Sequence, residues 1–314
     1  ATTGYRLPDV IMDIALDVDG RGEYTYLARR ISKQKEMPAK DIPVTSSGWY
    51  AFDPHDPRMI GYDYCTPDYI MGSLLIDPTL PRVESRVGSD LEEGYPALTC
   101  QNRYHAIVFS SDINARVVPQ CEGLGNRKTY GEQQAVQHKN VLLVQRHAKS
   151  KTTGDMRVIW GGKGMRSRIV EIDGWMILKE GDAWLGVKGF SRTKVDEPCG
   201  STWDNDVILR MNDGKAPVAF VAGRIKDFSN IDAFTKYLQG FAGKLEEGRF
   251  ILAEGLKDFL SLHLESGALP EIYGKSINLN PDMLFDSPFM SSVHGSGVVT
   301  IEKGNRKLLI ELGF

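Results

Sequence analysis

Residues 130–148 place a histidine and an asparagine directly before a short apolar run. The stretch reads YGEQQAVQHKNVLLVQRHA, and residues 141–144 are all apolar. Such a run predicts a buried strand. If the preceding residues are already extended, the side chains of His138 and Asn140 share one face of that strand. An imidazole can move a proton, and Tyr130 adds a phenol nearby in the sequence. The alternative is that His138 serves only as a structural hydrogen-bonding residue.

A second polar stretch, CTPDYIMGS, covers residues 65–73. Thr66 followed by Pro67 predicts the start of a short helix, because threonine caps helices and proline suits the first helical position. Asp68 and Tyr69 then lie near that start, where they could face a substrate.

A third polar stretch, CQNRYHAIVF, covers residues 100–109 and continues directly into an apolar strand. Asn102, Arg103 and His105 are its candidate binding residues. Polar clusters at strand ends also satisfy the backbone of loops, and the sequence leaves that structural alternative open.

Taken together, these residue types can perform one particular reaction, the removal of a proton next to the carboxylate of a uronate sugar. A base such as His138 or Tyr130 takes the proton, and an acid protonates the glycosidic oxygen. A donor such as Asn102 or Arg103 neutralises the carboxylate as negative charge develops. The sequence therefore indicates β-elimination on an acidic sugar chain.

A basic tract between Lys139 and Arg168 would attract such a chain. It holds eight cations against one anion, Asp155, in a protein whose net charge is −3. One interpretation is a positive groove for an anionic polymer. The other is a solvated surface. Nucleic acid is disfavoured because Trp160 is the only aromatic residue interleaved with these cations.

The sequence lacks the specific catalytic and metal-binding motifs. It has no HExxH, GxSxG, P-loop or EF-hand pattern, and the six histidines do not cluster at metal-ligand spacings. No cofactor is predicted. The acidic cluster TWDND at 202–206 is a candidate for a structural divalent cation of the Ca²⁺ type, or for a loop cap. A glycoside hydrolase would need two opposed carboxylates, and its candidates are Asp68, Glu132, Asp204 and Asp206.

Most of the chain predicts β-strands around these residues. The tract 156–190 has four short apolar runs separated by GGKG, DG and EGD, which is typical of an antiparallel meander. GVVTIE and KLLIEL flank KGNR and predict a C-terminal hairpin. A capping box at 229–232 predicts one helix, with apolar residues at helical spacing up to 241. The segment 7–22 is ambiguous between helix and strand.

Composition and length set outer limits. The chain has 314 residues, and no apolar stretch approaches the ~20 residues that span a bilayer. No membrane association is therefore predicted. The four cysteines form no CxxC pair and fit either two disulfides or free thiols. We expect an N-terminal segment at 1–45, a main β-sandwich at 46–223, and a C-terminal β unit with one helix at 224–314.

The order of these motifs resembles the β-sandwich half of heparinase-type proteins, in which a helical toroid precedes a multi-layered β-sandwich. The resemblance rests on YCTPDYIMGSL, CQNRYHAIVF, the strand at 130–144, DGWMILKEGDAWLGVK and the C-terminal 271–312. QHKNVLLV is similar to the histidine–asparagine strand of those β domains, with Lys139 between His138 and Asn140.

This resemblance implies a mainly β fold, a large antiparallel multi-layer β-sandwich with one or two helices. It also implies part of a polysaccharide lyase that is secreted or periplasmic. The expected partners are an anionic polysaccharide and a helical toroid domain or subunit. His138 and Tyr130 are the expected acid and base, and Trp160 or Trp203 is a candidate sugar-stacking platform, although tryptophan in β proteins often lies in the core.

Two other classes of function stay open. A non-catalytic sandwich that binds glycan or braces a partner domain would be favoured if His138 and Tyr130 were buried or far apart. An assembly protein would present the basic tract on an exposed flat face to an acidic partner.

Overall fold

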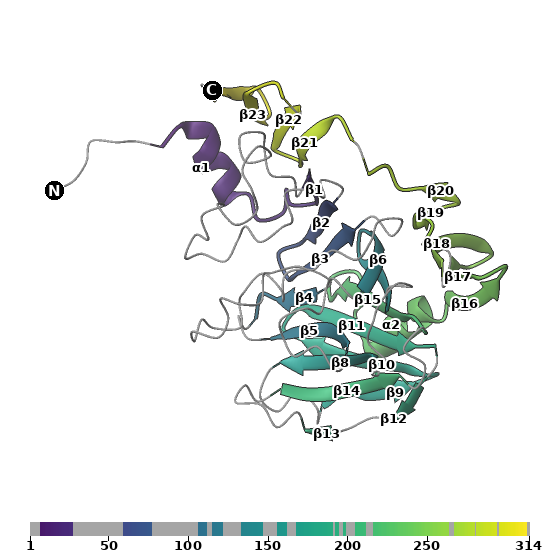
Figure 1. The fold of residues 1–314 in the computed structure, drawn as a ribbon. Helices are drawn as coiled ribbons and strands as arrows, with labels where there is room; N and C mark the ends of the chain where they lie inside the picture. Colours follow the sequence, from purple (N-terminus) through teal and green to yellow (C-terminus); the bar gives the residue numbers. More distant parts are fainter. Residues whose placement is uncertain are drawn as a thin grey trace.

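The structure, a computed structural model, describes residues 7–27, 59–76, 106–111, 115–121, 133–146, 156–161, 168–190, 192–194, 197–198, 205–211, 216–263, 267–279, 281–293 and 295–312. These residues form two helices and three antiparallel sheets (Figure 1). The chain is therefore a mainly β protein, and the prediction of a multi-layer β-sandwich with one or two helices is confirmed.

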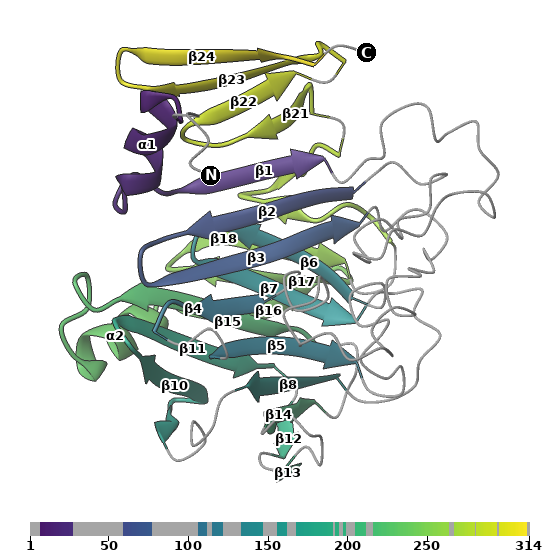
Figure 2. The same cartoon turned by 90° about the vertical axis from the view of Figure 1, so that its left-hand side faces the viewer.

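The largest sheet has thirteen strands. Figure 2 shows them following one another from β24 at the top to β13 at the bottom. Its order is β12-β14-β8-β5-β4-β3-β2-β1-β21-β22-β23-β24, and β13 pairs with β14. The strands are β1 (Glu23–Leu27), β2 (Met59–Cys65), β3 (Tyr69–Ile76), β4 (Ala106–Phe109), β5 (Arg116–Cys121), β8 (Met156–Gly161), β12 (Arg192–Lys194), β13 (Glu197–Pro198), β14 (Asn205–Met211), β21 (Met283–Asp286), β22 (Met290–Val293), β23 (Val298–Lys303) and β24 (Arg306–Glu311).

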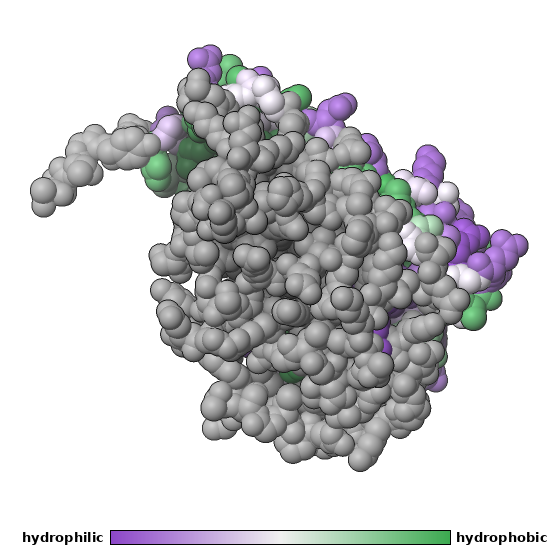
Figure 3. Space-filling view, viewed as in Figure 1, coloured by the Kyte–Doolittle hydropathy of each residue, from purple (hydrophilic) through white to green (hydrophobic). Residues whose placement is uncertain are grey.

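The other two sheets are smaller. The six-stranded sheet has the order β6-β7-β15-β11-β10-β9, and the five-stranded sheet runs from β16 to β20 in sequence order. Their strands are β6 (Gln133–His138), β7 (Val141–Arg146), β9 (Val170–Ile172), β10 (Trp175–Glu180), β11 (Ala183–Gly189), β15 (Val218–Arg224), β16 (Phe241–Glu246), β17 (Arg249–Glu254), β18 (Lys257–His263), β19 (Glu271–Ile272) and β20 (Lys275–Ser276). On the face shown in Figure 3, the described residues over the five-stranded sheet are mostly hydrophilic.

The six-stranded sheet is the middle layer, because apolar side chains cover both of its faces. Leu142 and Val144 of β7 belong to the core shared with the thirteen-stranded sheet. Val141 and Leu143 belong to the second core, formed with the five-stranded sheet and helix α2 (Ile231–Leu238). All four side chains are at most 2% exposed. A strand buried on both faces needs an apolar residue at every position, which explains the run VLLV and confirms it as a core strand.

The N-terminal segment contains a helix that packs against β23 and β24, at one edge of the thirteen-stranded sheet. Helix α1 (Asp9–Leu16) lies beside β23 (Figures 1 and 2). Lys303 Nζ forms an ion pair with Asp17 at 2.5 Å, and Arg306 pairs with Asp13 at 2.6 Å. The ambiguous segment 7–22 thus contains a helix. Strand β1 pairs with both β2 and β21, so pairing crosses the boundaries expected at 45 and 223.

Two other local predictions meet different outcomes. The predicted hairpin at the C-terminus is confirmed as β23–β24, with Lys303 opposite Arg306 across a two-residue turn. The predicted meander at 156–190 is confirmed for β9, β10 and β11, whereas β8 pairs in the large sheet instead. Local turn signals identify each strand but do not determine which sheet it joins.

Helix α2 is the helix that the capping signal predicted. Its N-cap is Asn230, whose Oδ1 accepts a hydrogen bond from Ala233 N at 2.9 Å. We expect Asn230→Ala to lower the free energy of unfolding by about 1 kcal/mol, because a backbone donor loses its partner. The matched control is the exposed neighbour Ser229→Ala, which should change it by less than about 0.5 kcal/mol. Chemical denaturation of both variants measures this difference. A larger loss of stability for Ser229→Ala than for Asn230→Ala would show that Asn230 is not the N-cap.

Candidate functional site

Two hairpin turns, the end of β15 and helix α2 bring together a group of polar side chains that we call the turn cluster. Lys139 N donates to Tyr62 Oη at 3.0 Å, and Asn140 Nδ2 donates to Tyr237 Oη at 3.2 Å. The rings of Tyr64 and Tyr69 lie 6.4 Å apart. The cluster consists of Tyr62, Tyr64, Asp68, Tyr69, His138, Lys139, Asn140, Arg224 and Tyr237.

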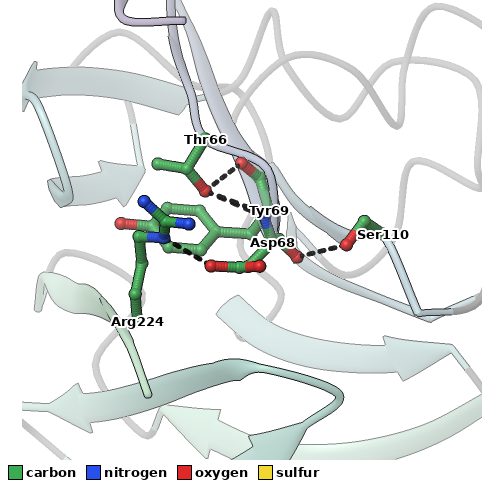
Figure 4. A network of polar contacts seen from close by, with 5 residues as sticks. All are labelled: Thr66, Asp68, Tyr69, Ser110 and Arg224. Carbon is green, nitrogen blue, oxygen red and sulfur yellow. Dashed lines mark hydrogen bonds and ion pairs between the residues drawn. The ribbon is translucent and has the colours of Figure 1, made fainter. Parts of the chain in front are cut away.

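The turn between β2 and β3 positions Asp68. Thr66 Oγ1 accepts hydrogen bonds from Asp68 N and Tyr69 N and donates to the Tyr69 carbonyl at 2.9 Å (Figure 4). Ser110 Oγ donates to the carbonyl of Asp68 at 3.0 Å. The prediction of a helix start at Thr66–Pro67 is wrong. Thr66 does bond backbone N–H groups as a helix cap does, but the chain turns directly into β3.

An ion pair between Asp68 and Arg224 joins the large sheet to the middle sheet. The Asp68 carboxylate points at the guanidinium of Arg224, which extends from the end of β15 (Figure 4). The side chains are 16% and 17% exposed, so solvent screens the pair only partly. Arg224 therefore has a structural partner on one edge of its guanidinium.

Removing this pair gives a measurable prediction. Asp68→Ala is expected to lower the free energy of unfolding by about 2 kcal/mol, because it leaves the mostly buried guanidinium of Arg224 without its carboxylate partner. Glu302→Ala, which removes an exposed pair with Lys307 at 3.8 Å, is the control and should cost less than about 0.5 kcal/mol. Equal losses in the two variants, measured by urea unfolding, would mean that the Asp68 pair contributes no more than a surface contact.

The second turn, between β6 and β7, separates His138 from Asn140. β6 ends at His138, and Lys139 takes a positive φ of 50° in the turn. Asn140 Nδ2 donates to the Ala222 carbonyl at 2.7 Å as well as to Tyr237. The expectation that His138 and Asn140 share one strand face is therefore wrong. The strand stops between them, and the Asn140 amide holds the hairpin against β15 and α2.

His138 lies between aromatic rings at the tip of β6. Its ring makes edge-to-face contacts with Phe259 at 5.7 Å and Tyr273 at 5.9 Å between centroids. Burial lowers the pKa of His138 below its ordinary value of 6.5, an effect that the nearby Glu23 and Glu254 partly oppose and Lys139 reinforces. The imidazole is thus neutral at pH 7 and able to accept a proton.

Exposed charged and aromatic groups surround this imidazole. Lys139 is exposed in the turn, and Tyr273 is 48% exposed with its hydroxyl donating to Glu254 at 3.4 Å. Burial and Glu254 raise the pKa of Tyr273, so its phenol stays protonated. A neutral base, a cation and a protonated phenol therefore lie close together.

The remaining tyrosines are also held as protonated donors. Tyr62 Oη donates to Glu23 at 2.6 Å, and burial raises its pKa well above the ordinary range. Burial likewise raises the pKa of Tyr69 and Tyr237. These phenols suit hydrogen bonding to a ligand or to the protein, and none of them suits the role of a base at neutral pH.

The structure corrects the interpretation of Trp160 as a sugar-stacking platform. Its ring is 1% exposed and stacks on Phe109 at 6.3 Å inside the core. A ring enclosed in this way presents no face to a sugar. The other candidates lie outside the described residues: Tyr130, Asn102, Arg103, His105, Trp203, Glu132 and Asp204. Asp206 lies on β14 opposite Trp160, and only its backbone is described.

Side chains are described for three of the eight cations of the basic tract, and one of these, Lys139, is exposed in the β6–β7 turn. Arg146 is 9% exposed, and Arg168 pairs with Glu180 at 2.6 Å. Four others lie outside the described residues, namely Lys149, Lys151, Lys163 and Arg166, and only the backbone of Arg157 is described. The described part of the tract therefore supports neither a flat basic surface nor a groove.

Sequence reasoning missed Tyr62, Arg224 and Tyr237 of the turn cluster, and it missed Tyr273 beside His138. One local signal was present, since GYDYC places Tyr62 and Tyr64 on one face of a strand that enters the Thr66 turn. Arg224 and Tyr273 carry no comparable signal, because only the pairing of distant strands brings them close.

Three further observations limit the chemistry. Within the described ranges, no group of three or more His, Cys, Asp or Glu side chains could hold a metal ion. No helix of the described residues is long and apolar enough to cross a membrane. Cys65 is a free thiol, and burial raises its pKa to about 12, so it is not a nucleophile at neutral pH.

Comparisons with protein-family models, with curated proteins and with solved structures give no match. The fold and the turn cluster are therefore the grounds on which a function rests.

Proposed function

We propose that this chain is the β-sandwich portion of a polysaccharide lyase, which cleaves an anionic, uronate-containing glycan by β-elimination. The observation that carries the proposal is the neutral, partly exposed His138 beside Lys139 and Tyr273. A lyase needs a base that is unprotonated at working pH, and burial gives His138 that property.

The three groups divide the reaction between them. His138 takes the proton from C5 of the uronate, and the C–H electron pair forms the C4=C5 double bond. The C4–O bond breaks, and the leaving oxygen takes a proton from the Tyr273 phenol. Lys139 offsets the negative charge that grows on the carboxylate during proton removal. A helical toroid domain or subunit would complete the substrate cleft, and a secreted or periplasmic setting would suit a polymeric substrate.

A second candidate is a sandwich that binds glycan without cleaving it. The observation that favours it is the use of Asn140 as a brace, because its amide is then not available to neutralise a substrate carboxylate. In this case the partly exposed rings of His138 and Tyr273 would serve as a platform for a sugar ring.

One experiment separates the two candidates. The protein is incubated with a panel of uronate polysaccharides and a neutral glucan, and the ultraviolet absorbance of the unsaturated uronate product is followed. Affinity electrophoresis in gels that contain the same polymers measures binding. Absorbance that rises with a uronate polymer alone supports the lyase. Retardation without any rise supports the binding module, and neither signal would reject both.

A further inference from the structure

Outside the turn cluster, the feature that most needs an explanation is a buried cation, Arg116. Arg116 at the start of β5 is 7% exposed. Its strand neighbour Val117 points into the core, so the Arg116 side chain lies on the opposite, outer face of the thirteen-stranded sheet. Directly opposite it stand Val108 on β4 and Gly161 on β8.

Arg116 has no partner in the part of the chain that the structure describes. Its backbone pairs with β4 and β8, but its side chain takes part in no hydrogen bond or ion pair with a described residue. Burial alone lowers the pKa of Arg116. Burying a cation without an anion is costly, and such groups are normally paired or bind a ligand.

The surroundings of Arg116 define what kind of anion fits. The cross-strand row that contains it runs from Ile70 through Val108 to Gly161. Ile70 is 39% exposed, and Gly161 has no side chain beside the guanidinium. The site therefore offers a planar cation next to a partly exposed apolar strip. A guanidinium pairs best with a planar carboxylate through two parallel hydrogen bonds.

We infer that Arg116 is a carboxylate-binding subsite for one uronate residue of the glycan, an assignment that rests on the proposed function for the identity of the sugar. The carboxylate pairs with the guanidinium, and the apolar face of the sugar ring covers Ile70 and Val108. The row begins two residues from Asp68, so this subsite lies on the sheet that also carries the β2–β3 turn.

Thermal unfolding with small ligands tests this subsite without requiring catalysis. Glucuronate is the probe, glucose is its neutral analogue, and sodium sulfate at matched ionic strength is the competing anion. At saturating glucuronate the unfolding midpoint of the wild-type chain should rise by about 2 °C. Arg116→Met should abolish that rise, and Arg116→Lys should weaken it because lysine lacks the planar fork. Lys257→Met removes an exposed cation elsewhere and should leave the rise unchanged.

The outcomes decide the assignment. A rise of equal size in Arg116→Met, or no rise in the wild-type chain, overturns it. A larger rise with sulfate than with glucuronate overturns the choice of a carboxylate. Should Arg116→Met fail to fold, Arg116→Gln takes its place with the same expectation. A midpoint shift without any unsaturated product would reject the proposed lyase activity and support the Arg116 subsite. Product formation without a midpoint shift would support the lyase activity and reject the subsite.

Discussion

Replacing His138 by alanine is expected to lower the rate of β-elimination by about 100-fold or more, because the reaction loses its general base. The surrounding rings of Phe259 and Tyr273 stay in place, so substrate binding should change much less than the rate. Initial rates of unsaturated-uronate formation, with the wild-type chain and the variant at equal folded concentration, measure the effect.

The matched control is His263→Ala. His263 lies on β18 and is half-buried like His138. Its backbone carbonyl accepts hydrogen bonds from Gln134 and Gln145, and the substitution retains that carbonyl. It should keep nearly the full rate. A His138→Ala variant as active as this control would remove His138 from the chemistry, and another group would have to serve as the base.

Leu142→Ala is expected to lower the free energy of unfolding by about 2–5 kcal/mol. The Leu142 side chain is 0% exposed in the core between the thirteen-stranded and six-stranded sheets, where the strands of the middle layer leave little freedom to fill a cavity. Denaturant unfolding monitored by fluorescence measures the loss.

Leu256→Ala makes the same chemical change at a fully exposed turn position. Its free energy of unfolding should stay within about 0.5 kcal/mol of the wild type. Similar losses at the two positions would contradict the two-core arrangement, since burial would then not distinguish them.

The contrast between strand β7 and the turn at Thr66 indicates how far the sequence alone leads. The run at 141–144 predicted a buried strand correctly, because a strand buried on two faces leaves an unbroken apolar signature. At Thr66 the same hydroxyl-to-backbone bonding occurs in helix caps and in tight turns, so the residue type could not choose between them. A local sequence pattern therefore predicted the buried strand, but it could not distinguish a helix cap from a tight turn, because both use the same hydrogen bonds.

The residues of the candidate site likewise differ in whether the local sequence could predict them. His138 was found from its position at the end of an apolar strand. Its ring partners Phe259 and Tyr273 and the ion pair of Asp68 with Arg224 arise from contacts between distant segments, which no short sequence window contains. Predicting them requires the order of strands in all three sheets, which depends on long-range pairing.

The measurement that tests the proposed chemistry most directly is the initial rate of β-elimination from about pH 5 to about pH 8. His138 is faced by Glu23, Glu254, Lys139 and Tyr273, and burial lowers its pKa below 6.5. The neutral imidazole therefore persists to lower pH than that of an ordinary histidine. The rate should stay level above pH 6.5 and fall only at lower pH, as His138 becomes protonated. A rate that declines already above pH 6.5 as the pH falls, or no elimination at any pH, would contradict His138 as a neutral base.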